Sequence, residues 1–383
     1  MLDQARRRTL EFSRRLKEAG IPLAILTDQS SIAYLAGFWG YLSVEFGRPT
    51  FLILGADDDP VVVTPLMEFE LVSAMTWVDR VVTWTDSGSM RWERVLSETL
   101  GANPQTIGIE THSVPAIVRN FLVESYPSVQ FKDVASILGE QRMIKSPEEI
   151  DVMRKAGQIG GAMMAAAQAA LAEDIPEYEA ALAAINAGTR KAAGFLTDRG
   201  WEAFVSPMIH NLQIMQSGRD TAMVHRRASV KRLERGDPVY FCFCNMVEFK
   251  HYRLGFDRMF FVREASDEAA HVQETAVAAQ QAALAVISEG AIAEDVAGTA
   301  NEVYRSAGFE PGYRTGRSIG VSYLEQPELK QGDKTRLQAG MTFAVDGGIT
   351  IEGKLGGRIG DSIVVTKTGF EYLTDYPRSL LIA

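Results

Sequence analysis

The sequence has 383 residues, which is longer than one hydrophobic core usually grows, so we expect two domains. An apolar content of 46% and a charged content of 23% are ordinary for a folded globular protein and exclude a disordered or fibrous chain. The formal net charge of -10 argues against a nucleic-acid partner, because nucleic-acid-binding surfaces carry an excess of basic residues.

The N-terminus has the pattern of a charged amphipathic helix without the apolar core of a signal peptide, and no run of the chain predicts a membrane span. The only two cysteines, Cys242 and Cys244, are spaced i and i+2 in an apolar run, a poor geometry for a disulfide. This pattern favours a reducing, cytoplasmic setting.

The first part of the chain alternates short apolar runs with helical patterns. Strands are predicted at residues 21–28, 49–56, 58–65, 78–84, 106–110 and 129–134, and helices at 30–38, 68–75, 91–101 and 114–127. Such alternation indicates an α/β domain with a mixed sheet, which we place at residues 1–140.

The second domain, residues 141–383, begins with the helix signal Ser146-Pro147-Glu148-Glu149, which combines an N-cap, a proline at N1 and early acidic residues. The Met and Ala residues of this helix are expected to serve packing. Further helices are predicted from Ile175 to about Ala193 and over residues 267–287, and strands over 239–246, 340–351 and 356–366.

Chemistry-bearing residues gather between Ser217 and Arg258. His225 lies in a polar segment between two turn signals, and Asp257 begins a second strand behind the apolar run 239–246. A base candidate and a carboxylate on adjacent elements are the minimum for general acid/base catalysis.

Motifs in both halves resemble the creatinase/aminopeptidase family, whose catalytic domain has the "pita-bread" fold. The linker at residues 142–156 is similar to the one that opens that domain, and the C-terminal landmarks are Gly236-Asp237, Thr315 to Gly320, Ala339 to Phe343 and Gly356 to Ile359. The resemblance covers nearly the whole chain. It implies a creatinase-like N-terminal α/β domain, a pita-bread catalytic domain and a homodimer.

Peptidases of this family hold two metal ions with two aspartates, a histidine and two glutamates. The corresponding positions here are Cys242, Gly255, Arg317, Asp346 and Gly360. A dinuclear site needs several anionic oxygen ligands, and one such residue remains, so the resemblance implies no metal, no cofactor and no metallopeptidase activity.

The metal-free hydrolases of the family offer a closer pattern. His225, after Ser217-Gly218, resembles the segment that carries the catalytic histidine of creatinase. The run Phe46-Gly47-Arg48-Pro49 resembles the stretch whose arginine reaches the substrate carboxylate across the dimer interface.

Two aspartates complete the resemblance to creatinase. Asp257 and Asp346 fall where creatinase has guanidinium-binding glutamates, so both carboxylates are shorter here, and a second carboxylate-binding arginine has no counterpart after Tyr323. Residues 313–323 and 332–343 are more similar to ectoine hydrolase, which opens a cyclic amidine but has a glutamate in place of Cys242. The resemblance therefore supports the reaction type better than the substrate.

The hypothesis from these residues is a metal-independent hydrolase of a small C–N compound that bears a carboxylate and an amidine or guanidine group. A histidine with a pKa near the working pH can deprotonate the attacking water and protonate the departing nitrogen. We assign that role to His225, the cation contacts to Asp257 and Asp346, and the carboxylate contact to Arg48 of a partner subunit, with Phe46 beside it.

Two candidate pocket residues, Arg317 and Cys242, each have two possible roles. Arg317 is a further anion contact or the partner of an aspartate, and Cys242 is a nucleophile or a small packing residue. Tyr252 and Tyr323 are candidates for the pocket lining, and His210, His251 and His271 are interpreted as structural.

Each site residue also has a structural interpretation. His225 and Arg48 could be surface residues, Asp257-Arg258 a local ion pair, and Asp346 a turn residue before Gly347-Gly348. At the level of function, the rivals are a non-catalytic binding module and a lyase or metallohydrolase with an unusual site of Cys242, Asp346 and a histidine.

Overall fold

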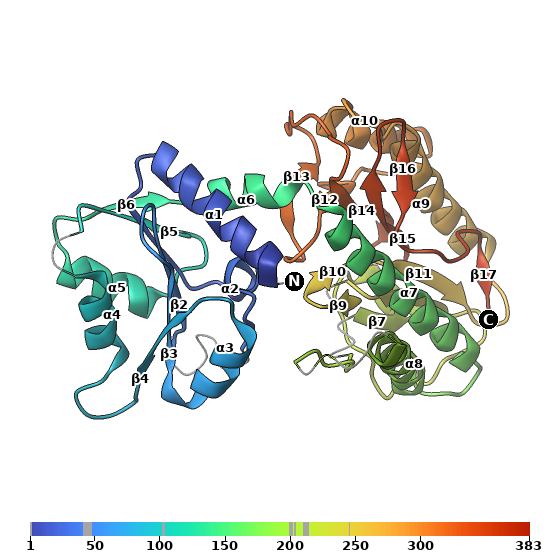
Figure 1. The fold of residues 1–383 in the computed structure, drawn as a ribbon. Coiled ribbons are helices and arrows are strands. Elements are labelled where there is room, and N and C mark those ends of the chain that lie inside the picture. Colours follow the sequence, from blue (N-terminus) through green and yellow to red (C-terminus); the bar gives the residue numbers. More distant parts are fainter. Residues whose placement is uncertain are drawn as a thin grey trace. The chain divides into compact units, whose positions relative to one another are not determined.

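The computed structural model describes residues 2–40, 48–101, 104–198, 202, 204–209, 214–244 and 246–383. The chain divides into two compact units, Met1–Gln141 and Arg142–Ala383 (Figure 1). No helix within the described ranges is both long and apolar enough to cross a membrane.

A six-stranded sheet in the order β4-β3-β2-β1-β5-β6 forms the centre of the first unit. Pairing is antiparallel between β1 and β2 and between β2 and β3, and parallel at the other three contacts, so the predicted mixed sheet is confirmed. The strands are β1 (Leu23–Leu26), β2 (Phe51–Gly55), β3 (Val61–Pro65), β4 (Arg80–Trp84), β5 (Thr106–Ile109) and β6 (Gln130–Asp133).

Helices carry the chain between these strands. They are α1 (Leu2–Glu18), α2 (Gln29–Ala36), the 3₁₀ turn η2 (Leu66–Glu68), α3 (Phe69–Met75), α4 (Trp92–Leu100), α5 (Ala116–Ser125) and α6 (Ala135–Met143). Every residue of β2 and β3 is buried, as expected for strands covered on both faces. Trp84 and Trp92 belong to the core that holds sheet and helices together.

The second unit opens with α7 (Pro147–Ala170), which starts where the sequence predicts. Ser146 accepts a hydrogen bond from the backbone N–H of Glu149, and the Glu149 carboxylate accepts one from the backbone N–H of Ser146, a complete capping box. The other helices are α8 (Glu177–Asp198), α9 (Asp267–Ala285) and α10 (Ala293–Ser306). Helix α8 continues past the predicted end at Ala193.

A nine-stranded sheet forms the other layer of this unit, in the order β13-β12-β14-β15-β11-β8-β7, with β16 paired to β15 and β17 to β11. It is the predicted pita-bread domain, built by antiparallel pairing along this order. The strands are β7 (Ile214–Ser217), β8 (Pro238–Cys242), β11 (Asp257–Phe261), β12 (Gly316–Ser318), β13 (Glu325–Leu329), β14 (Thr342–Ile351), β15 (Leu355–Val365), β16 (Phe370–Tyr372) and β17 (Leu381–Ile382).

One predicted strand is shorter than expected. The apolar run from Val239 to Met246 predicts a single strand, but β8 ends at Cys242. The backbone N–H groups of Met246 and Val247 both donate to the carbonyl of Phe243, so the chain turns there. It then forms the small hairpin of β9 (Glu248–Phe249) and β10 (Tyr252–Arg253). Apolar residues in this turn pack as core, and hydropathy does not distinguish them from strand residues.

Candidate active site

Strand register places three of the predicted site residues, Cys242, Asp257 and Asp346, in one row across the sheet. Cys242 of β8 lies opposite Asp257 of β11, Asp257 lies opposite Gly360 of β15, and Gly360 lies opposite Asp346 of β14. Asp346 is therefore inside a strand, and its interpretation as a turn residue is wrong. Residues more than a hundred positions apart share one level because antiparallel partners face one another directly.

Gly360 allows the two carboxyl groups to approach one point. A Cβ atom at Gly360 would lie 2.8 Å from Oδ2 of Asp257 and 2.9 Å from Oδ1 of Asp346. Gly255 has a similar role, since its Cβ would lie 2.6 Å from the Cβ of Ala344 and 3.0 Å from Nη2 of Arg317. The space that a side chain would need at either glycine is filled by its neighbours.

Asp257 is held from two sides and is 6% exposed. The hydroxyl of Tyr240 donates to Oδ2 at 3.0 Å, and Sγ of Cys244 lies 3.3 Å from Oδ1. Burial raises the pKa of Asp257 well above its usual range, and the nearby Cys244 and Asp346 add to this effect. Asp257 is therefore a carboxyl group that retains its proton at higher pH than an exposed aspartate.

The alternative interpretation of Asp257 and Arg258 as a local ion pair is not borne out. Arg258 is 1% exposed, and its Nη2 donates to Oδ1 of Asp361 at 2.8 Å. Its remaining donors reach backbone carbonyls, including that of Asp257. The local ion-pair interpretation is therefore wrong, because strand alternation sends the two neighbouring side chains to opposite faces of the sheet.

Arg317 contacts both Asp346 and Cys244. Its Nη1 donates to Oδ2 of Asp346 at 2.5 Å, and its Nη2 lies 2.8 Å from the hydroxyl of Tyr323 and 3.2 Å from Sγ of Cys244. Its guanidinium carbon also lies 4.4 Å from the centre of the Tyr323 ring. Of the two alternatives left open for Arg317, the structure has the pair with an aspartate.

Asp346 offers the free acceptor at this site. Burial raises its pKa, although Arg317 acts in the opposite direction. Its Oδ1 atom is buried and has no hydrogen-bond partner among the described residues. The Asp346 side chain is 28% exposed, whereas that of Arg317 is 3% exposed. Together with half-buried Tyr323, Asp346 therefore forms the open side of the site.

The two thiols behave differently although both are buried and free. Burial raises the pKa of Cys242 well above its usual range. A hydrogen bond from Cys242 lowers the pKa of Cys244 well below its usual range, and this effect and the charge of Arg317 outweigh burial. We call Tyr240, Cys242, Cys244, Asp257 and Arg317 the site floor.

Two members of the site floor were missed by the sequence analysis. Tyr240 and Cys244 lie in an apolar run, where a tyrosine or a free cysteine is normally core. The available signal was strand alternation, which puts Tyr240 and Cys242 on the same face, and the shared i, i+2 spacing of the two cysteines.

His225 lies outside the site floor. It is exposed, in a bend that follows the 3₁₀ turn η3 (Gly218–Ala222), and it has no hydrogen bond or ion pair with another described residue. No described contact joins it to Asp257 or Asp346. Its assignment as the catalytic base therefore stays a prediction.

The segment that carries His225, residues 218–228, is fixed at both ends by Glu177. This carboxylate is fully buried. It accepts hydrogen bonds from the Ser217 hydroxyl at 2.7 Å and from the backbone N–H and hydroxyl of Ser229 at 2.8 and 2.7 Å. Glu177 therefore connects the two ends of the His225 segment by hydrogen bonds to Ser217 and Ser229.

Arg48 belongs to the other unit. Its Nε and Nη2 donate to the two carboxylate oxygens of Asp86 at 3.1 and 2.6 Å, at the protein surface. Phe46 lies outside the described residues, as does His210. The contact of Arg48 with a substrate of the partner subunit stays a prediction.

The remaining predicted residues are accounted for by local contacts. Tyr252 donates to Glu149 at 2.7 Å, away from the site floor. Burial lowers the pKa of His251 to about 4, and the ring of His271 lies 5.9 Å from that of Phe309. Tyr323 is in the site, through Arg317.

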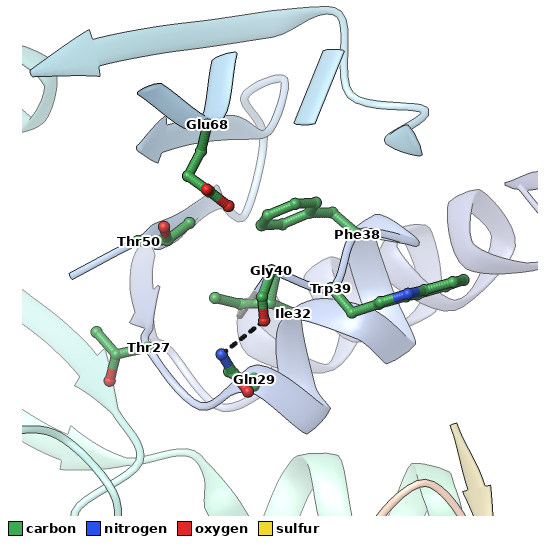
Figure 2. A pocket seen from close by; sticks show the side chains of 8 residues that line it. All are labelled: Thr27, Gln29, Ile32, Phe38, Trp39, Gly40, Thr50 and Glu68. Atoms are coloured by element: carbon green, nitrogen blue, oxygen red, sulfur yellow. Dashed lines mark hydrogen bonds between the residues drawn. The ribbon is translucent and has the colours of Figure 1, made fainter. Parts of the chain in front are cut away.

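The first unit contains a cavity of about 10 Å³, room for about one water molecule. Glu68 points into it in Figure 2, its Oε2 atom and the hydroxyl of Thr27 are buried without a hydrogen-bond partner among the described residues, and burial raises the pKa of Glu68. The cavity is too small for an organic substrate. It is lined by Thr27, Gln29, Ile32, Phe38, Trp39, Gly40, Thr50 and Glu68.

Comparison with known proteins decides the family. Residues 151–367 match the model of metallopeptidase family M24, and residues 8–144 match the creatinase/prolidase N-terminal domain. The chain belongs to metallopeptidase family M24.

Relatives of this M24 protein have different chemistries in their names. Agropine synthesis cyclase of Rhizobium rhizogenes is 27% identical over 379 residues, covering 94% of this chain and 93% of that protein. Creatinase of Bacillus sp. (strain B-0618) is 28% identical over 402 residues, covering 98% and 91%. The prolidase structure from Pyrococcus furiosus superposes with a TM-score of 0.79 at 25% identity, covering 95% and 99%. The M24 protein is thus a hydrolase or cyclase of the creatinase/M24 family.

The family name implies a metal centre, and the donor set can be tested against it. Among the five positions that the sequence resemblance assigns to metal ligands, Gly255 and Gly360 offer no side-chain donor and their space is filled. Another of these positions is Arg317, whose guanidinium group is paired with the carboxylate of Asp346. These residues do not fit a dinuclear centre, because its charge needs several anionic oxygens.

A smaller donor group remains in the described part of the chain. Sulfur and oxygen atoms of Cys242, Cys244 and Asp257 lie within 4.8 Å of one another, a combination that suits a single soft ion such as Zn²⁺. Arg317 contacts one of these sulfurs and Tyr240 the carboxyl, so protein donors already occupy the group. A cation at 3.2 Å from a sulfur opposes the binding of a dication.

Proposed function

We propose that this M24 protein is a metal-independent hydrolase that cleaves a non-peptide C–N bond in a small compound with a carboxylate and an amidine or guanidine group. The observation that supports this most is the row in which Asp257 and Asp346 converge over Gly360. Two carboxyl groups at one point match the paired N–H groups of a planar amidinium.

Asp346 and Arg317 lie at the end of this row where a substrate would bind. Oδ1 of Asp346 has no partner among the described residues, so a substrate N–H would complete its hydrogen bonding. Arg317 balances the negative charge of one group in the site, that of Asp346. Any further negative charge in the site is then available to a cationic substrate. Arg317 and Cys242 would line the pocket, and Arg48 with Phe46 from a second copy would hold the carboxylate.

Reaction at an amidine carbon needs two proton transfers. Water loses a proton as it attacks, and the departing nitrogen gains one, and a histidine can do both in turn. We assign this role to His225, supported by its place on a segment that Glu177 fixes at both ends. A cofactor has no part in this sequence of steps.

A cyclase is the second candidate. One relative, agropine synthesis cyclase, covers most of this chain. Ring closure with loss of water is the reverse of hydrolytic ring opening, so one site can stabilise the intermediate of both. The short side chains of Asp257 and Asp346 leave more room than glutamates and favour a cyclic or substituted cation. The weaker alternatives are a non-catalytic binding module and an enzyme with an unusual metal site.

A homodimer in the cytoplasm is part of the proposal. The dimer is what would bring Arg48 to a partner's site, and two free buried thiols suit a reducing compartment.

The test is a turnover screen of purified protein with creatine, guanidinoacetate, ectoine, hydroxyectoine and carboxylated lactams or amidines. Products are followed by mass spectrometry, and peptides ending in proline serve as comparison substrates. Cleavage of an amidine or guanidine without added metal would support the proposal, and cleavage confined to dipeptides would overturn it.

A further inference from the structure

Two hydrogen-bond donors point at the sulfur of Cys244. It lies 3.2 Å from Nη2 of Arg317, which can only donate, and it receives a hydrogen bond from Cys242. The residue is 4% exposed. A buried sulfur that accepts from a guanidinium and from a thiol is in the environment of a thiolate.

An acid lies against this sulfur. Oδ1 of Asp257 is 3.3 Å from Sγ of Cys244, and Oδ2 of Asp257 accepts from Tyr240. One proton lies between the sulfur and the carboxyl group. The charge of Arg317 favours the arrangement in which the sulfur is negative and the carboxyl neutral.

We propose that Cys244 is the nucleophile of this site, attacking the amidine carbon of the substrate, and that Asp257 is the acid beside it. This rests on the proposed function. With Cys244 and Asp346 negative, Arg317 positive, and Asp257 and Cys242 neutral, the site has one net negative charge. That charge complements a cationic amidinium.

In the first half-reaction, the thiolate forms a C–S bond and the C=N electron pair moves to nitrogen. Asp257 gives its proton to the leaving nitrogen, the C–N bond breaks, and an amine departs, or remains tethered if the substrate is cyclic. A cationic thioimidate stays on Cys244.

In the second half-reaction, water attacks the thioimidate carbon and loses a proton to His225. The C–S electrons return to sulfur as the carbonyl forms, and the hydroxyl proton returns to Asp257. His225 passes its proton to the amine. The sum is one amidinium and one water to one amide or urea and one ammonium ion, with the enzyme unchanged.

Cys242 is the less suitable thiol. It contributes a hydrogen bond to Cys244, and burial raises its pKa. Access also favours Cys244, because Arg317 touches both Cys244 and the partly exposed Asp346 on the open side. The groups that face Cys244 are Cys242, Asp257, Arg317 and Tyr323, and they set its protonation.

The first test is alkylation of the native full-length protein by iodoacetamide at about pH 6, where an ordinary thiol with a pKa near 8.5 is almost unreactive. Peptide mass mapping compares the wild type with C244S and C242S, and unfolded protein labelled at about pH 8.5 confirms that both thiols can react. We expect labelling of Cys244 in the wild type and in C242S, and none in C244S. Labelling of Cys242 first, or of neither thiol in the native protein, overturns the proposal.

The second test is turnover. In C244S, kcat should fall by about a thousandfold or more with an unchanged thermal midpoint, and acid-quenched wild type should contain a substrate adduct on Cys244. Equal turnover by C244S and wild type would remove the nucleophile but leave the hydrolase. If the wild type cleaves no amidine or guanidine, the proposed function fails, and the alkylation result still decides whether Cys244 is a thiolate.

Discussion

The site floor and the His225 segment are built in opposite ways. The site floor is buried. Strand register fixes Cys242 and Asp257 in it, and contacts with Asp257 and Arg317 hold Cys244 in the turn that follows β8. The His225 segment is a connection with an exposed histidine, held at its base by Glu177 and along its length by bonds such as those of Gln216 to Met223 and Gly356 to Thr221. Groups whose charges must be set in advance therefore lie buried on the strands or, like Cys244, in the turn directly after β8, and the proton carrier lies on an exposed connection.

The largest expected effect is on the His225 segment. His225→Ala should lower turnover by about a thousandfold, because a general base of this kind contributes on the order of 10²–10⁴ in rate. The thermal midpoint should stay the same, since the residue is exposed and makes no described contact. The control is His112→Ala, another exposed histidine. Near-normal turnover of the His225 variant would contradict the assignment.

On the site floor, Arg317→Met should cost about 3 kcal/mol in the free energy of unfolding, because it leaves buried anionic groups without their cation. The matched control is Arg154→Met, which removes an exposed pair with Glu371 and should cost less than about 1 kcal/mol. Urea unfolding followed by circular dichroism measures both. Equal losses in the two variants would mean that Arg317 is an ordinary surface-type ion pair.

Gly360→Ala tests the convergence of the two aspartates. The added methyl would lie within 3.0 Å of both carboxyl groups, and we expect a loss of about 2 kcal/mol together with loss of ligand binding. The control, Gly194→Ala on the exposed side of α8, has open space and should raise stability by about 0.5–1 kcal/mol. A Gly360 variant that binds ligand normally would contradict the proposal that Asp257 and Asp346 bind the substrate together beside Gly360.

Glu177→Gln loosens the His225 segment without touching the site floor. The amide keeps one acceptor and loses the charge, so we expect about 1 kcal/mol of destabilisation. Hydrogen exchange should accelerate in residues 218–228 and not in β8 or β11. Uniform acceleration across the second unit would show that Glu177 supports the whole fold and not this segment.

The smallest effect concerns pH. Because burial raises the folded-state pKa of Asp257, the folded protein binds more protons than the unfolded chain, and this carboxyl destabilises the fold increasingly as pH rises above about 4. Asp257→Asn should therefore gain stability relative to the wild type between about pH 4 and neutrality. A difference that stays constant over this range would mean that Asp257 is ionised throughout.

Local signals in the sequence predicted much of the fold. The six strands of the first unit and the cap at Ser146 follow from hydropathy and helix-start chemistry, which act within a few residues. Cys242, Asp257, Asp346 and Arg317 were found through motif order. The role of Gly360 was not predictable from spacing, because it depends on three strands coming into register.

The site floor shows where sequence reasoning fails. Tyr240 and Cys244 lie in an apolar run, where such residues are normally core, so no local pattern singles them out as site residues. The structural alternative of an ion pair between Asp257 and Arg258 is wrong, because the partner of Arg258 is Asp361, far along the chain. Partner choice inside a sheet is set by face and register, and a single sequence contains neither directly.

The most direct test of the central claim is the metal content of the active protein. Elemental analysis of the purified dimer or monomer, with turnover measured before and after dialysis against a chelator, addresses the proposed site itself. The account predicts substoichiometric metal and unchanged turnover of a carboxylated amidine or guanidine. Stoichiometric metal whose removal abolishes turnover would contradict it, and would make Cys242, Cys244 and Asp257 the ligands to examine.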